Sequence, residues 1–306
     1  MPHLGMNPVV VSSRTVIYEF SPDNPPCCRV NPGDTVVFET MDAFGGQILS
    51  EQDLFEKVGW HRVNPATGPV VVEGAQSGDT LCVEIHSIRT SFKGVMVAVP
   101  GLGAVPDKMS KSRTFVIPIR NGLAHLPGDI LLETRPMIGV IGTAPQKGSI
   151  PCGTPGPHGG NMDTKIIAEG ATVYLPVFVQ GGLLAMGDLH ALMGDGEVLV
   201  SGVEVAGKVT VKVNLIKKRT LPCPLVETKD AFYAIWSEKT LDEAVYQVVW
   251  RSADLLSQHL GLDFDECVLL LSARGNLQIS QVVDPLKTVR MEIPKVLLKG
   301  KSLVSI

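Results

Sequence analysis

A Gly-centred turn followed by alternating apolar residues recurs four times between residues 31 and 176. The segments are NPGDTVVFE (31–39), QSGDTLCVE (76–84), LPGDILLET (126–134) and AEGATVYLP (168–176). In such turns Asp hydrogen-bonds its own backbone, and Gly supplies a φ that other residues avoid. The alternation that follows has the period of a half-buried strand. Recurrent turn chemistry explains the repeats more simply than internal duplication does, and with either origin this part of the chain is mainly antiparallel β.

The rest of the chain also favours short strands. The sequence has 31 glycines, 22 prolines and only 5% aromatic residues, which indicates many turns. Further strands are expected at residues 9–20, 70–72, 95–99, 114–119, 172–179, 196–212 and 233–235. In the strand expected at 196–212 and just beyond it, valines at 203, 205, 209, 211 and 213 alternate with residues that can face water.

Two helices are expected near the C-terminal end. Thr240 to Glu243 forms a capping box, an apolar stripe follows, and Gly261 is a natural stop. Asp263 to Glu266 repeats the capping pattern and predicts a shorter helix over residues 266–272. We therefore expect one α+β domain over residues 1–306, predominantly β, with packed antiparallel sheets in a sandwich-like arrangement. Residues 1–215 would form the β core with the active site, and 216–306 a helix-containing part packed on it.

Composition excludes several classes of protein. The net charge is −4 and no Lys/Arg block occurs, which argues against a nucleic-acid partner. No run of about 18 apolar residues predicts a membrane span, and the N-terminus lacks the pattern of a Sec signal. The six cysteines form no Cys-x-x-Cys pair, so we expect reduced thiols in a cytoplasmic protein.

The stretch from residue 154 to 197 concentrates Gly, His and carboxylates. A Gly/Pro-rich loop carries His158, Asn161 and Asp163, and the segment MGDLH places Asp188 and His190 two residues apart. In an extended chain, side chains two residues apart project to the same face. Imidazole and carboxylate groups are the ligands that zinc and similar ions use. The alternative for an isolated Asp-x-His is structural hydrogen bonding.

Four further residues have both a chemical and a structural interpretation. Asp195 and Glu197 lie beside glycines in MGDGE, where a carboxylate could serve as general base. A simple turn explains the same sequence equally well. Asp42 ends a predicted strand and precedes Gly-Gly, which suits either a pocket wall or a turn. Cys152 has no local base and is interpreted as a buried thiol. No Gly-x-Ser-x-Gly elbow or phosphate-binding loop occurs, and residues 139–142 are too short for a dinucleotide fingerprint.

Several motifs in this order resemble the acetamidase/formamidase family. They are NPGDT (31–35), TMDA (40–43) with the following Gly-Gly, NPATGP (64–69), GVIG (139–142), HGGNMD (158–163) and MGDLHALMGDGE (186–197). The resemblance implies an amidase that cleaves C–N bonds other than peptide bonds, converting acetamide or formamide to the acid and ammonia. It also implies a mostly β fold and a homodimer or higher homo-oligomer. Formamidase-like members tend to have Glu-Asn where this chain has Pro157-His158, so a metal role for His158 is not general in the family.

The resulting hypothesis gathers five residues around one or two divalent cations: Asp42, His158, Asp163, Asp188 and His190. Zinc is the first candidate, with calcium as the candidate for a second ion. Asn161 would orient the amide or donate to the oxyanion, Glu197 would act as general base, and Asp195 beside it is a further catalytic candidate.

The substrate pocket is expected to be small. Residues such as Phe44, Leu183 and Met186 would admit a methyl group and reject long acyl chains. The competing hypotheses are a β-rich binding protein without turnover and a metal-assisted hydrolase or decarboxylase of another carbonyl or urea-like compound.

Overall fold

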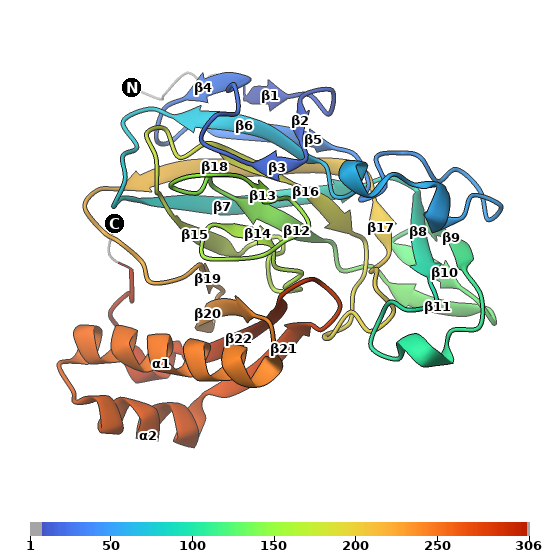
Figure 1. Ribbon diagram of the computed structural model, residues 1–306. Helices are drawn as coiled ribbons and strands as arrows, with labels where there is room; N and C mark the ends of the chain where they lie inside the picture. Colours follow the sequence, from blue (N-terminus) through green and yellow to red (C-terminus); the bar gives the residue numbers. More distant parts are fainter. Residues whose placement is uncertain (1–7, 305–306) are drawn as a thin grey trace.

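The computed structural model describes residues 8–304, which form two large β-sheets and two helices (Figure 1). The expectation that the N-terminus lacks a Sec signal rests partly on residues 1–7, which lie outside the described residues. Within residues 8–304, no helix combines the length and the apolar character needed to cross a membrane.

The first sheet has nine strands, and all neighbours are antiparallel except the first pair. In spatial order they are β1 (Val9–Val11), β5 (Thr35–Thr40), β18 (Gly207–Ile216), β7 (Thr80–Thr90), β15 (Thr172–Pro176), β19 (Leu225–Glu227), β20 (Ala231–Glu238), β22 (Lys287–Pro294) and β21 (Asn276–Gln281). The sheet therefore joins the N-terminal strands to the C-terminal ones without a break.

The second sheet has eleven strands and carries the polar residues of the 154–197 stretch. Its main path is β11 (Ile130–Glu133), β10 (Leu123–Leu126), β9 (Arg113–Arg120), β8 (Lys93–Ala98), β17 (Glu204–Val205), β16 (Leu184–His190), β12 (Met137–Gly142) and β14 (Gly159–Asn161). β6 (Ala66–Val72) pairs with β16 and also with β2 (Val16–Ile17) and β4 (Cys28–Val30). A separate pair joins β3 (Glu19–Phe20) to β13 (Ile150–Pro151).

The main hydrophobic core lies between the two sheets. Val36 and Phe38 of β5 belong to the same buried cluster as Ile138 of β12 and Met186 of β16, and all four are 0% exposed. Facing apolar sides of two antiparallel sheets make a sandwich. The expected α+β, predominantly β fold with packed sheets is confirmed.

A helical layer covers the C-terminal end of the first sheet (Figure 1). α1 (Leu241–Leu260) begins at the capping box of Thr240 and ends at Gly261, whose φ is 70°. Its Ala244 and Val248 share a second core with Phe232 of β20. α2 (Phe264–Arg274) starts two residues earlier than expected, because Asp263 is the cap itself. Short 3-10 helices lie at Phe55–Lys57, Trp60–Arg62, Pro106–Lys108 and Lys295–Leu298.

The repeated turns behave as their chemistry predicts. Asp34 and Asp79 each accept a hydrogen bond from the backbone N–H three residues earlier, at 2.7 and 2.8 Å. The expectation of a single strand over residues 196–212 is wrong for the first half of this range. Gly196 and Glu197 have φ of 93° and 45°, values that make a turn, and the long strand begins only at Gly207.

Candidate active site

The polar cluster is centred on β16, a strand buried along its whole length. β12 pairs with one of its edges, and β6 and β17 pair with the other. Asp188 and His190 project to the same side, and Asp188 Oδ1 lies 3.6 Å from His190 Nε2. Asn64, just before β6, donates from Nδ2 to Asp188 Oδ2 at 2.9 Å.

Strand register brings a third polar side chain to this point. Glu204 of β17 lies directly opposite His190 in the antiparallel pair, and its Oε2 is 3.1 Å from His190 Nε2. Glu204 is 2% exposed, because β17 lies between β16 and β8 inside the sheet. Glu204 interrupts a run of apolar residues, and its pairing with His190 explains why a carboxylate is at this position.

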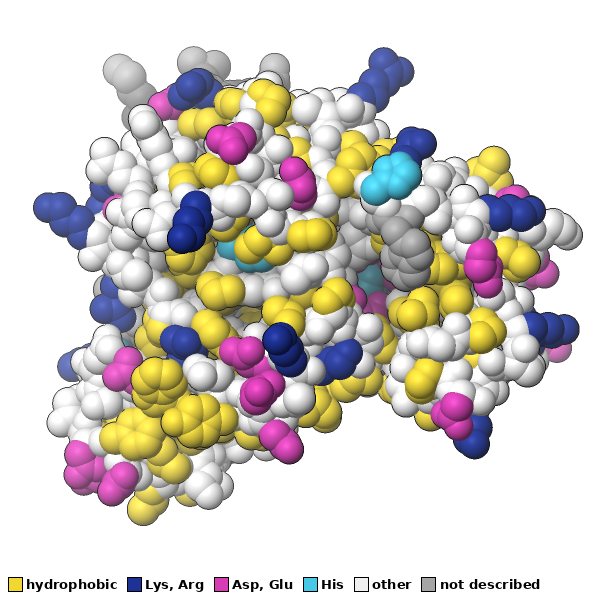
Figure 2. All heavy atoms as spheres, in the orientation of Figure 1, with side chains coloured by type: hydrophobic (Ala, Val, Ile, Leu, Met, Phe, Trp, Pro, Cys, Tyr) yellow, Lys and Arg dark blue, Asp and Glu magenta, His cyan; other side chains and the backbone are white. Residues whose placement is uncertain are grey.

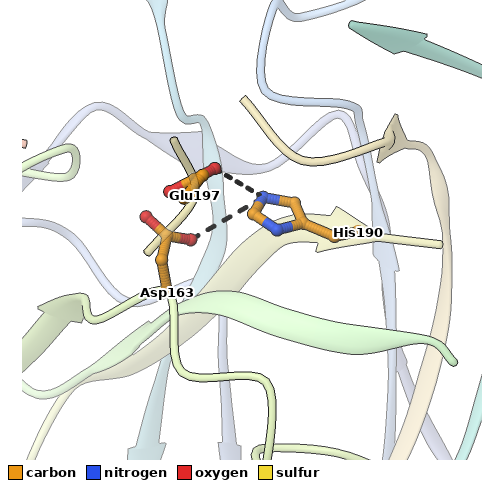
Figure 3. A group of neighbouring side chains, drawn as sticks. All are labelled: Asp163, His190 and Glu197. Carbon is orange, nitrogen blue, oxygen red and sulfur yellow. Dashed lines mark ion pairs between the residues drawn. The ribbon is translucent and has the colours of Figure 1, made fainter. Parts of the chain in front are cut away.

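Two loops complete the cluster (Figure 3). Asp163 follows β14, and its Oδ1 is 3.7 Å from His190 Nε2. Glu197 lies on the turn after β16, and its Oε1 is 3.9 Å from the same nitrogen. Both residues adopt positive φ, of 38° and 45°. One imidazole N–H therefore faces four carboxylates, although it can donate to only one at a time.

Burial and mutual repulsion dominate the electrostatics. Loss of solvation, with repulsion from neighbouring carboxylates, raises the pKa of Asp163, Glu197 and Glu204 well above the ordinary values. Burial alone would lower the pKa of His190, but Glu204 and Asp188 raise it well above its usual range. A single imidazolium cannot neutralise four buried carboxylates, so ionisation of all four would require additional positive charge in the cluster.

The cluster has the donor set of a cation site. Asp163, His190 and Glu197 bring ligand atoms within 4.8 Å of one another, and so do Asp188, His190 and Glu204. Asp163 Oδ1, Asp188 Oδ1 and Glu197 Oε2 are buried and have no hydrogen-bond partner in the described part of the chain. Buried oxygens without donors are costly unless a cation or proton satisfies them. The residues present therefore fit a divalent ion.

Two of the proposed metal ligands, His158 and Asp42, belong to neither ligand group. His158 packs edge-on against Phe20 at 5.1 Å between ring centroids, and burial lowers its pKa to about 4. Neither ring nitrogen has a hydrogen-bond partner among residues 8–304, and His158 belongs to neither ligand group. Asp42 accepts hydrogen bonds from Phe44 N and Gly46 N, at 2.9 and 3.0 Å. Its carboxylate therefore holds a turn, as the structural alternative predicted.

The two remaining candidates differ from each other. Asn161 donates from Nδ2 to Asp284 Oδ2 at 2.9 Å and lines the cavity above the cluster. Asp195 accepts two hydrogen bonds from Arg290, each 2.8 Å long, and lies 2.8 Å from Lys165 Nζ. Burial opposes ionisation of Asp195, but these two cations lower its pKa below the ordinary value. Asp195 does not line the cavity and serves as an anchor for the turn that carries Glu197.

Sequence reasoning missed three residues of the site. They are Glu204, Asn64 and Asp284, which all line the cavity. A charged residue flanked by Val203 and Val205 was a signal for Glu204, because a glutamate inside a buried strand needs a partner. Asp284 lies in the loop between β21 and β22, far along the sequence from the residues of the cluster, and no local pattern marks it.

A cavity of about 860 Å³ opens above the cluster. Asp163, Asp188, Glu197 and Glu204 line its polar end. Figure 2 shows acidic and histidine side chains set back in a recess between the lobe that carries β8–β11 and the rest of the molecule. Phe44 lines the cavity as expected, whereas Leu183 and Met186 do not. The expectation of a small pocket is therefore wrong in size and in two of its three named lining residues.

These observations define a class of protein, namely a β-sandwich with a buried carboxylate–histidine cluster beneath an open cavity. The model of the acetamidase/formamidase family matches residues 7–151 and 148–297. The chain belongs to the acetamidase/formamidase family.

Individual relatives agree with this placement. The crystal structure of acetamidase from Bacillus halodurans is 46% identical, with a TM-score of 0.94, over 95% of this chain and 99% of that one. A predicted acetamidase/formamidase from Thermoanaerobacter tengcongensis is 49% identical with a TM-score of 0.94, over 97% and 99% of the two chains. A formamidase from Methylophilus methylotrophus is 29% identical over 255 residues, which cover 64% of this chain and 63% of that protein. This chain thus matches just under two thirds of that curated relative's length.

Proposed function

We propose that this protein is an amidase that hydrolyses a linear amide, with acetamide and formamide as the first candidates, to the carboxylic acid and ammonia. The observation that carries the proposal is the buried carboxylate–histidine cluster at the floor of an open cavity, in a member of this family. The names of its relatives, acetamidase and formamidase, support the same reaction.

The cluster suits one or two divalent cations, with zinc as the first candidate and calcium for a second ion. Asp163, His190 and Glu197 form one candidate ligand set, and Asp188, His190 and Glu204 form the other. Because the two sets share His190, its Nε2 would bind one ion at a time, and a second ion would be held by carboxylates alone. A bound ion would polarise the amide carbonyl and lower the pKa of a water molecule. The orphaned carboxylate oxygens, which no donor among residues 8–304 satisfies, support this part of the proposal.

Protein groups would carry the proton transfers. Water adds to the amide carbonyl carbon, the C–N bond breaks, and the nitrogen leaves as ammonia after it gains a proton. Glu197 would take the proton from the water and pass it to the leaving nitrogen. Its Oε2 has no hydrogen-bond partner among residues 8–304, so one carboxylate oxygen could take the proton while the other faces the ion. Asn161 would donate from its amide to the carbonyl oxygen, at the edge of the cluster.

Ammonia release from acetamide, formamide, propionamide and urea tests the reaction. We expect release from at least one linear amide, and Glu197→Gln should reduce kcat by about 100-fold or more. Glu73→Gln is the matched control, because Glu73 lies beyond the end of β6, outside the cavity, and forms an ion pair with Arg29. Release from urea alone would favour a hydrolase of urea-like compounds. Ligand or metal retention without any ammonia would favour a binding protein, and full activity after exhaustive chelation would contradict the metal.

We also propose a homo-oligomer in the cytoplasm. All six cysteines are free thiols, which suits a reducing compartment. Apolar side chains gather on the outer face of the helical layer (Figure 2), and Tyr246 and Leu269 are 68% and 64% exposed there. Light scattering should give a mass above that of one chain, and Tyr246→Glu with Leu269→Glu should reduce it.

A further inference from the structure

The cavity is divided into a polar end and an apolar wall. The polar end holds the carboxylates that surround His190, and the apolar wall includes Phe44, Phe55, Val63, Val97, Leu102 and Val200. All six belong to one hydrophobic cluster, separate from the main core. Within this wall the rings of Phe44 and Phe55 meet edge-to-face, with 5.9 Å between their centroids.

The wall is joined to the cluster by direct backbone links. Glu204 is paired in register with Val95 of β8, and Val97, two residues further along, faces the cavity. On the other side, Asn64 donates from its backbone N–H to Ala43 O at 2.7 Å and from its side chain to Asp188. Val63 precedes Asn64 and belongs to the wall. A substrate whose amide reaches the carboxylates therefore has apolar side chains beside its acyl group.

Size supports the same conclusion. A cavity of about 860 Å³ is near the upper end of what small-molecule sites have, about 300–1,000 Å³. Acetamide and formamide would fill a small part of it and leave the apolar wall against water. Apolar surface left in water contributes nothing to binding, whereas an acyl chain laid on it gains affinity with each methylene.

We propose that this site takes primary carboxamides whose acyl group is apolar and longer than acetyl, of about four to eight carbon atoms. The proposal rests on the amidase activity proposed above and names its substrate class. Phe44, Val63, Val97 and Leu102 are then specificity-determining residues, because they contact the acyl group and leave the reacting carbonyl to the polar cluster.

The experiment measures kcat/KM along the series acetamide, propionamide, butyramide and hexanamide. We expect a rise of about fourfold for each added methylene, and roughly 100-fold or more from acetamide to hexanamide. Leu102→Trp, which fills the apolar end, should lower kcat/KM for hexanamide at least tenfold more than it lowers that for acetamide. Val105→Trp is the matched control, since Val105 lies in the same loop, is 48% exposed and does not line the cavity.

Calorimetry with the product acids keeps the two proposals separate. Hexanoate should bind at least tenfold more tightly than acetate, and Leu102→Trp should remove the difference. Acetamide turnover with a flat or falling series and equal acid affinities would overturn the apolar subsite and leave the amidase proposal intact. If no amide in the series releases ammonia, the amidase proposal fails, and the acid affinities alone decide whether the wall binds acyl chains. If Leu102→Trp does not fold, the wild-type amide series and the wild-type acid affinities decide between an apolar subsite and none.

Discussion

Gly139 of β12 shows how one missing side chain makes room for the cluster. A Cβ at this position would lie 2.5 Å from Asp163 Oδ1, 2.8 Å from Asp188 O and 2.9 Å from Asp188 Oδ2. Backbone and carboxylate atoms of two candidate ligands therefore occupy the space that any other residue would need. This explains in physical terms why glycine begins the GVIG segment.

Gly139→Ala should separate Asp163 from Asp188 and impair the site. We expect a loss of about 1–3 kcal/mol in the free energy of unfolding and at least a tenfold lower kcat/KM for the best amide. Gly194→Ala is the control, because a Cβ there meets nothing within 4 Å. Denaturant unfolding and ammonia release measure both variants. Equal activity of the two would show that the spacing of these carboxylates is not critical.

At the residue scale, the sequence predicted the part of the site that local spacing determines. Asp188 and His190 lie on the same side as predicted, with 3.6 Å between Asp188 Oδ1 and His190 Nε2, although Asp188 has a φ of 55° and departs from simple strand alternation. Glu204 could not be found in this way, since its position depends on which strands pair and in which register. The concentration of Gly, His and carboxylates predicts that His158 joins Asp163, but the Gly-Gly turn between them places the imidazole against Phe20.

At the element scale, the hairpin of β21 and β22 connects the C-terminal part to the site. Gly196 N donates to Ser280 O at 2.8 Å, and Val282 N donates to Gly196 O at 3.1 Å. Arg290 of β22 is 1% exposed and binds Asp195 through both terminal nitrogens. The turn that carries Glu197 is thus fixed by the hairpin, whose loop also brings Asp284 to the cavity.

Arg290→Ala should loosen this turn. We expect a loss of about 2–3 kcal/mol in unfolding free energy, because a buried guanidinium and its two hydrogen bonds to a carboxylate are removed. Activity should fall in kcat more than in KM, since Glu197 loses its position while the cavity wall is unchanged. Arg290→Lys should recover part of both, and Asp195→Asn in the Arg290→Ala background should cost little more. Full kcat in Arg290→Ala would contradict a positioning role.

At the scale of the whole molecule, the turn repeats, the capped helices and the mainly β character could be predicted from the sequence, because each depends on residues close together in the chain. The order of the strands could not. β18 lies between β5 and β7, two strands that come more than 100 residues earlier in the sequence. Likewise, β16 lies between β12 and the early strand β6. Such pairings follow from the packing of two complete sheets, and no local pattern encodes them.

This long-range assembly makes the stability of the sandwich depend on the cluster. Its carboxylates come from β16, β17 and two loops, so their repulsion acts between strands that the sandwich must hold together. A cation bound at the cluster in the folded state alone stabilises that state, by about 2.7 kcal/mol at a concentration 100-fold above its Kd. For a chain of this size we expect Tm to rise by at least about 5 °C when zinc is added to chelated protein.

The two histidines provide the internal comparison for this stabilisation. His190→Asn removes a nitrogen ligand shared by both groups and should abolish most of the zinc-dependent rise in Tm, together with bound metal measured by elemental analysis. His158→Leu changes an equally buried imidazole outside both groups, so its Tm should still rise with zinc even if the variant begins at a lower Tm. If His158→Leu loses the zinc-dependent rise in Tm and His190→Asn keeps it, the cation binds near His158 and not at the cluster around His190. The cluster around His190 would then require another explanation for its unpartnered carboxylates.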